Sequence, residues 1–99
     1  MGITFSDAAR QDLAEITAWF EEHTALGGAG FATLIRRTVE RIGKMPFASP
    51  PWRHAWRFRA WTLEHVHYRI FYEVTDQAIR VVAIAHTDRR PGHWLDRNK

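Results

Sequence analysis

Residues 55–94 decide the fold of this chain and read AWRFRAWTLEHVHYRIFYEVTDQAIRVVAIAHTDRRPGHW. Successive side chains of a β-strand point to opposite faces of its sheet, and both WRFRAW (56–61) and HVHYRIFYEV (65–74) show this alternation. IRVVAIA (79–85) is apolar at nearly every position, which predicts an interior strand covered on both sides. With TDQA (75–78) as a hairpin turn, the stretch predicts three consecutive strands.

Alternation within the first two of these strands places arginines together on one face of the sheet. One face is expected to be apolar and to include Trp56, Phe58, Ala60, Val66, Tyr68, Ile70, Tyr72 and Val74. The opposite face is expected to display Arg57, Arg59, Trp61, His67, Arg69, Phe71 and Glu73. The pattern therefore predicts a core that includes Trp56 and an open, arginine-rich face that binds an anionic partner.

The segment before these strands predicts a short strand at residues 3–5 and two helices. Ser6 is a favourable N-cap for the first helix, which should end near His23, where glycines interrupt the helical spacing. Its apolar stripe is Ala9, Leu13, Ile16 and Phe20. The second helix should end near Met45, because Pro46 stops it. Its inner face is Phe31, Leu34, Ile35, Thr38, Ile42 and Met45.

These elements predict one α+β domain that spans residues 1–99, with the order β-α-α-β-β-β. Two antiparallel helices are expected to pack on one face of a twisted, mostly antiparallel sheet, and the basic face is expected to remain open. Residues 86–99 lose periodicity and are expected to form an irregular C-terminal tail.

Composition narrows the class of protein. A hydrophobic fraction of 45% and a charged fraction of 25% are typical of a globular domain. Without cysteine there is neither a disulfide nor a thiolate zinc site. The His-x-His pair at 65 and 67 has no third ligand at a convincing spacing, so no metal and no cofactor are expected. The start of the sequence shows no export signal and no apolar run suits a membrane span, so a cytoplasmic location is expected.

Charge is distributed unevenly along the chain. Residues 1–30 carry five acidic residues and one basic residue, whereas the remainder carries thirteen basic and six acidic residues. Of the fourteen cations twelve are arginine, whose planar fork matches phosphate and carboxylate. The second half is therefore expected to bind nucleic acid or an acidic protein segment; an arginine bias from a GC-rich genome is the alternative explanation.

The order of elements, together with three segments, resembles the RelE/ParE superfamily of toxins from bacterial type II toxin–antitoxin modules. The segments are ARQDLAEITAWF (9–20), HYRIFYEV (67–74) and IRVVAIAHTDRRPGHW (79–94). The resemblance implies a protein that inhibits growth when free and is neutralised by a cognate antitoxin. It also implies one of two mechanisms: ParE-like members inhibit DNA gyrase, and RelE-like members enter the ribosome and cleave mRNA.

A RelE-like mechanism would use particular residues of this chain. The resemblance places Arg69 and Arg89 at the phosphate-binding arginines of RelE-like toxins, and Arg57 and Arg59 can occupy the positions of their paired lysines. The C-terminal tyrosine of that site is absent, since Trp94 stands in its region.

Proton transfer at such a site would fall to a histidine. The guanidinium of arginine stays protonated and is a poor base, so His67 and His86 are the candidates by position. The predicted catalytic set of a nuclease is therefore Arg69, Arg89 and His86. The alternative for His86 is a strand-end histidine that forms a hydrogen bond with the backbone.

Binding of nucleic acid or antitoxin is predicted for a second set of residues, namely Arg57, Arg59, Trp61, His67, Arg90 and Trp94. The alternative is that Glu64 and Glu73 pair with the arginines, and that Trp52 and Trp94 hold irregular segments on the sheet. The tail, with a histidine before paired arginines, favours the ParE-like mechanism. The remaining functional alternative is a degenerate toxin that survives only as a non-toxic antitoxin-binding module.

Overall fold

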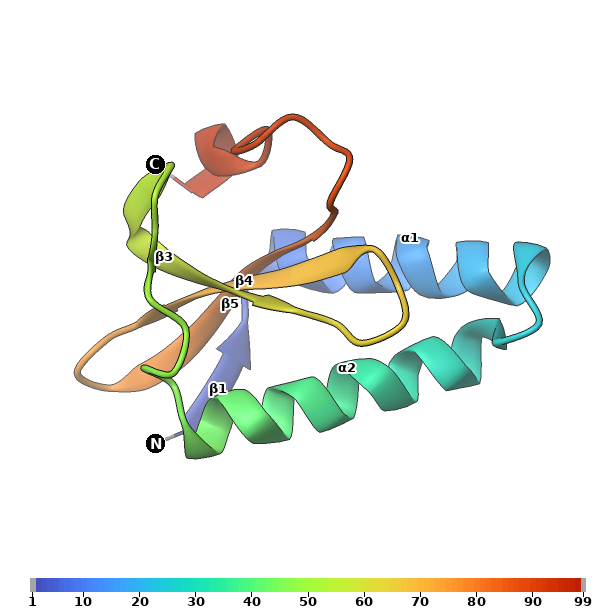
Figure 1. Cartoon of the computed structure of the whole chain (residues 1–99), viewed down its shortest axis with the longest axis horizontal. Coiled ribbons are helices and arrows are strands. Elements are labelled where there is room, and N and C mark those ends of the chain that lie inside the picture. The colour runs from blue at the N-terminus through green and yellow to red at the C-terminus, as the bar shows by residue number, and fades with distance from the viewer. Residues whose placement is uncertain (1, 99) are drawn as a thin grey trace.

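The computed structural model describes residues 2–98 as two helices and a five-stranded sheet (Figure 1). In chain order the elements are β1 (Gly2–Phe5), α1 (Asp7–His23), α2 (Gly27–Lys44), β2 (Pro51–Trp52), β3 (Ala55–Thr62), β4 (Tyr68–Val74), β5 (Ala78–His86) and a 3-10 helix (Leu95–Asn98). The strand order is β1-β5-β4-β3-β2, with β1 parallel to β5 and the other pairs antiparallel. The predicted architecture is confirmed, and the two-residue strand β2 is an addition to the predicted order.

Helix α1 begins and ends where local chemistry favours it. The Ser6 hydroxyl accepts a hydrogen bond from the Ala9 amide at 3.1 Å, which satisfies one of the free N–H groups of the first turn. Within the predicted stripe, Ala9 and Phe20 are buried and Leu13 and Ile16 pack against the same core. The predicted stripe and the end near His23 are therefore confirmed.

Helix α2 begins at Gly27, because the three glycines that interrupt the helical spacing (Gly27, Gly28 and Gly30) belong to the helix rather than to a loop. Gly27 has a positive φ of 73° at the start of α2. A Cβ atom on Gly28 would lie 3.1 Å from the Thr17 carbonyl oxygen, so this glycine allows α1 and α2 to approach closely. The Gly28 amide also donates to a Glu21 carboxylate oxygen at 2.8 Å. Met45 is 53% exposed and lies just beyond the helix, which corrects its predicted place on the inner face.

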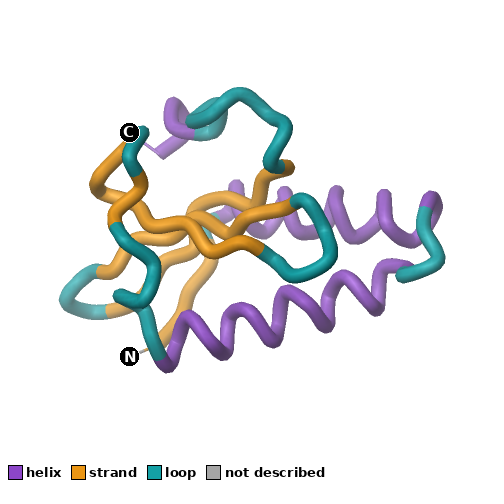
Figure 2. Tube along the Cα trace, viewed as in Figure 1, coloured by secondary structure: helices purple, strands orange, loops and turns teal. Residues whose placement is uncertain are grey.

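The sheet has an apolar cluster on each face. The helix-side cluster includes Phe20 and Phe31 from the helices with Ile70 and Tyr72 from β4. The cluster on the opposite face joins side chains of the strands to the segment after β5 and consists of Phe58, Phe71, Val82, Ala83, Ala85 and Trp94. Figure 2 shows α1 and α2 on one side of the strands and the C-terminal helical turn on the other. The face that was expected to be open is therefore partly covered.

Strand β3 is oriented the other way round from the prediction. Ala60 is paired with Phe71, on the face away from the helices, and Trp61 is paired with Ile70, on the helix side. Trp56, predicted to lie in the core, is 76% exposed. The predicted alternation along the strand is correct. Both faces of this sheet bury apolar side chains, so the apolar residues of β3 do not by themselves show which face lies against the helices.

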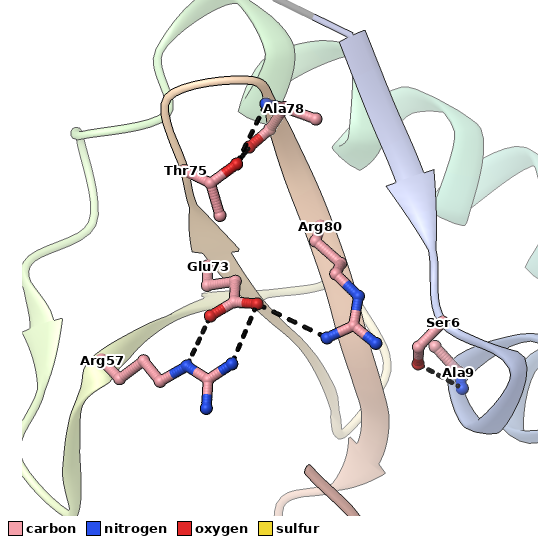
Figure 3. Close-up of polar contacts among 7 residues, drawn as sticks. All are labelled: Ser6, Ala9, Arg57, Glu73, Thr75, Ala78 and Arg80. Atoms are coloured by element: carbon pink, nitrogen blue, oxygen red, sulfur yellow. Dashed lines mark hydrogen bonds and ion pairs between the residues drawn. The ribbon is translucent and has the colours of Figure 1, made fainter. Parts of the chain in front are cut away.

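Strand β5 is an interior strand, as predicted, and most of its residues are buried. Between its pairs Phe71 with Ala83 and Tyr72 with Val81, Val82 is an extra residue, so β5 contains a bulge. The hairpin turn predicted at 75–78 is confirmed by the Thr75 amide, which donates to the Ala78 carbonyl at 2.9 Å. The Thr75 hydroxyl also bonds with the Ala78 backbone (Figure 3).

The buried hydroxyl of Tyr72 leads us to expect that the free energy of unfolding falls at alkaline pH. This hydroxyl donates to the Pro46 carbonyl at 2.8 Å, and burial raises its pKa. The unfolded chain ionises tyrosine near pH ~10, so the stabilising contribution is present below that pH and is lost as the pH rises above it. We expect Tyr72→Phe to flatten the fall of the free energy of unfolding between about pH 10 and 11, measured by urea denaturation. Parallel curves for the two proteins would contradict this.

Candidate functional site

The chain after β5 folds over the sheet and encloses a small hollow with basic walls, here called the basic hollow. It is lined by Arg69, Phe71, Ala85, His86, Thr87, Arg89, Arg90, Pro91, Gly92, His93 and Trp94. The segment of residues 87–93, here called the basic loop, leaves the end of β5 and returns across the face opposite the helices (Figure 1). Five of the predicted site residues therefore come together: Arg69, His86, Arg89, Arg90 and Trp94.

Backbone hydrogen bonds fix the path of the basic loop. The Thr87 amide donates to the His67 carbonyl at 2.8 Å, which joins the loop to the start of β4. Further on, the Arg89 amide donates to the His86 carbonyl at 3.1 Å and the His93 amide to the Arg90 carbonyl at 3.2 Å. These bonds form successive turns, so the irregular tail has a defined path.

Trp94 anchors the end of the basic loop. Its side chain is only 2% exposed, and its ring centroid lies 4.6 Å from that of Phe71, 5.1 Å from that of Phe58 and 5.7 Å from that of Trp52. The expectation that Trp52 and Trp94 hold irregular segments on the sheet is confirmed. The Trp94 ring offers almost no surface to a partner, which corrects its prediction as a binding residue.

The arginine side chains of the basic hollow are unpaired in the part of the chain that the structure describes. Within residues 2–98, the guanidinium groups of Arg69, Arg89 and Arg90 make no hydrogen bond or ion pair. The arginines that do have partners between residues 51 and 97 are Arg53, Arg57, Arg59, Arg80 and Arg97. Because like charges repel, three unpaired cations around one hollow create a positive potential that favours an anionic ligand.

Arg57 lies in a different cluster, shown in Figure 3. Its guanidinium donates to both Glu73 carboxylate oxygens, at 2.6 and 3.3 Å, and Arg80 approaches the same carboxylate at 3.4 Å. The hydrogen bond with Glu73, reinforced by the charge of the carboxylate, raises the pKa of Arg57. The predicted alternative of Glu73 as an arginine partner is confirmed, whereas Glu64 pairs with Arg41 at 2.7 Å instead.

Arg59 and Trp61 lie away from the basic hollow. Arg59 is paired with Tyr72 on the helix side of the sheet, where it donates to the Ser49 carbonyl and lies 4.9 Å from the centroid of the Phe47 ring. Trp61 packs against the helix-side core. The predicted common face for Arg57, Arg59 and Arg69 is therefore wrong, since Arg59 lies on the face opposite Arg69.

The histidines near the basic hollow differ in the nitrogen that remains available. His86 Nδ1 accepts a hydrogen bond from the Asp88 amide at 3.0 Å. A neutral imidazole has one such acceptor nitrogen, so this bond occupies it, as the backbone-bonded alternative for His86 predicted. His93 Nδ1 lies 3.2 Å from the Arg90 carbonyl, to which it can only donate, so Nε2 is its acceptor. His67 is exposed, with its ring centroid 6.1 Å from that of His86.

Sequence reasoning did not select His93 as a site residue, although it lines the basic hollow. The signal was its place in HTDRRPGHW, two residues after a proline and next to the anchoring Trp94. Within residues 2–98, no three histidine or acidic side chains come close enough to hold a metal ion. No helix in the same range is long and apolar enough to cross a membrane.

Proteins of known structure share this architecture. A chain of the chromosomal ParDE toxin–antitoxin system from P. aeruginosa aligns with a TM-score of 0.66 and 17% identity, over 89% of this chain and 97% of that chain. The toxin–antitoxin complex RelBE2 from Mycobacterium tuberculosis contains a chain with a TM-score of 0.61 and 16% identity, over 88% of this chain and 92% of that chain. The isolated E. coli RelE toxin aligns with a TM-score of 0.61 and 14% identity, over 98% of this chain and 95% of that chain.

These likenesses define the class of the molecule as a RelE/ParE-like fold. The model of a family described as the ParE toxin of type II toxin-antitoxin system, parDE, matches residues 3–91. The chain therefore belongs to the ParE toxin family, within the RelE/ParE superfamily that its sequence resembles. No curated protein sequence matches the chain.

Proposed function

We propose that this chain is a growth-inhibiting toxin that acts in the cytoplasm as a non-catalytic inhibitor of DNA gyrase and is neutralised by a cognate antitoxin. Membership of the ParE toxin family supports the toxin role. The similar chains from the ParDE system and the RelBE2 complex support a hetero-oligomeric complex with an antitoxin.

The observation that favours gyrase inhibition over mRNA cleavage is that the predicted arginines do not form one cluster. Cleavage of a phosphodiester needs several cations on one phosphate together with a base and an acid. Arg57 is paired with Glu73, and Arg59 lies on the other face of the sheet. Between residues 51 and 97, the arginines without a partner among the described residues are Arg69 and the two of the basic loop, Arg89 and Arg90, an arrangement suited to docking on an acidic surface of the target.

The bonding of His86 supports the same mechanism. A general base needs an acceptor nitrogen within reach of the proton that it removes, and the Asp88 amide already occupies that nitrogen of neutral His86. Protonated His86 can serve only as an acid or as a cation. The nuclease set of Arg69, Arg89 and His86 therefore lacks a base in this arrangement.

A second candidate, the RelE-like mRNA endonuclease, is favoured by one observation. His93 lines the basic hollow beside the arginines, and its Nε2 remains an acceptor because Nδ1 bonds with the Arg90 carbonyl. In that mechanism His93 would take the proton of the attacking 2′-hydroxyl, while Arg69 and Arg89 stabilise the charge on the phosphate.

Two parallel assays with the purified protein separate the candidates. We expect inhibition of gyrase supercoiling, relieved by the antitoxin encoded beside the gene, and intact mRNA in a reconstituted translation reaction analysed by primer extension. Cuts in the mRNA that disappear with His93→Ala would replace the proposal with the endonuclease mechanism. Tight antitoxin binding without an effect in either assay would indicate the degenerate, non-toxic module.

A further inference from the structure

We infer that Asp12 and Arg97 form a clasp that positions the basic loop, so that its arginines stay beside Arg69. Both residues lie outside the predicted site, and neither lines the basic hollow. The inference rests on the proposed function, in which the basic hollow contacts the target. In that function Asp12 and Arg97 are positioning residues rather than contact residues.

The clasp joins the two ends of the chain. Asp12 lies in α1 and Arg97 in the C-terminal 3-10 helix, 85 residues apart. One guanidinium nitrogen of Arg97 donates to Asp12 Oδ1 at 3.1 Å and another donates to Oδ2. The Asp12 side chain is only 16% exposed. A bidentate pair of this kind fixes orientation as well as distance, and its partial burial limits screening by salt.

The same pair also binds the bulged part of β5. Asp12 Oδ2 accepts a hydrogen bond from the Ile84 amide at 3.0 Å, and Arg97 donates to the Val82 carbonyl at 3.3 Å. Val82 is the extra residue of the bulge, where the regular ladder is interrupted. The clasp therefore holds α1, β5 and the C-terminal helix together at one point.

The basic loop needs such a clasp because its arginines are repelled by the positive charge of Arg69 beside them. It is held at one end by β5 and at the other by Trp94 and the clasp. Between these ends, the unpaired guanidinium groups of Arg89 and Arg90 share the hollow with that of Arg69. Mutual repulsion favours a loop that swings away from the sheet, and the clasp opposes that movement.

Arg97→Gln tests the inference in the intact protein, because it removes the ion pair but leaves Asp12 to accept from the Ile84 amide. We expect hydrogen exchange of the Thr87, Arg89 and His93 amides, followed by NMR, to be faster by roughly tenfold. Exchange in β4 should not change. Arg97→Lys keeps the charge without the planar fork and should have an intermediate effect.

Arg36→Gln is the matched control, since Arg36 is exposed on α2 and has no ion pair within residues 2–98. If loop exchange in Arg97→Gln equals that in the control, the inference is wrong. Exchange that rises equally in β4 would also overturn it, because the pair would then stabilise the whole fold. Faster loop exchange with undiminished gyrase inhibition would uphold the clasp and reject the role of the basic hollow in the proposed function.

Discussion

Trp94→Ala is expected to lower the free energy of unfolding by about 3–5 kcal/mol, the range for a large aromatic side chain removed from a core. The Trp94 ring is almost completely buried against Phe58, Phe71 and Trp52, in the cluster on the face away from the helices. No other side chain of the C-terminal segment belongs to the buried members of that cluster, within the residues that the structure describes. The substitution therefore leaves a cavity and also frees the end of the basic loop.

Trp56→Ala provides the matched control for this prediction. It removes the same side chain from a site that is 76% exposed, so its effect should stay within about 0.5 kcal/mol. Urea denaturation followed by far-UV circular dichroism measures both variants. If Trp94→Ala proved as mild as Trp56→Ala, the C-terminal segment would not pack on the sheet in solution. Far-UV circular dichroism of the folded variants checks that the helices are retained.

The helices and β5 could be predicted because their signals are local. The stripe from Ala9 to Phe20, the Ser6 cap and the apolar run from Ile79 each fix an element without reference to the rest of the chain. The start of α2 could not be found in this way. Gly28 breaks a helix on intrinsic preference, but here the glycine lets the helix pack closely on Thr17.

The orientation of β3 could not be predicted from its own pattern. A period of two separates Trp56 and Phe58 from Arg57 and Arg59, but it does not say which set faces the helices. That depends on the cover of the second face, which Trp94 supplies from far along the chain. The two wrong predictions for β3, a buried Trp56 and an Arg59 on the face away from the helices, both result from not knowing which face of the strand lies on the helix side.

The basic hollow was predictable where its residues are close in sequence or paired in the sheet. His86, Arg89 and Arg90 are close neighbours in HTDRRPGHW, and β4–β5 pairing brings Arg69 next to Ala85, the residue that precedes that segment. The clasp was not predictable, because Asp12 and Arg97 lie at opposite ends of the sequence and only the folded chain brings them together. Long-range side-chain pairs of this kind leave no periodic signal.

The double variant Arg69→Ala/Arg89→Ala is expected to weaken inhibition of the target by about 100-fold, because each charged contact with an anionic partner contributes roughly 1.5 kcal/mol. Neither guanidinium has a partner within residues 2–98, so stability should stay the same or rise slightly as repulsion is relieved. The gyrase supercoiling assay measures the first effect, and thermal unfolding measures the second. A loss of activity without a loss of stability would identify the basic hollow as a contact surface.

Arg57→Ala is expected to lower stability slightly and to leave gyrase inhibition unchanged, the reverse of the effects expected for Arg69→Ala/Arg89→Ala. The single substitution breaks the ion pair with Glu73, which keeps Arg80 as a partner. Because the Arg57 side chain is 55% exposed, the cost should be at most about 1 kcal/mol. Gyrase inhibition should not change, since Arg57 lies outside the basic hollow. Toxicity abolished by Arg57→Ala but retained by Arg69→Ala/Arg89→Ala would show that the basic hollow is the wrong site. The functional role predicted from the sequence would then return to Arg57.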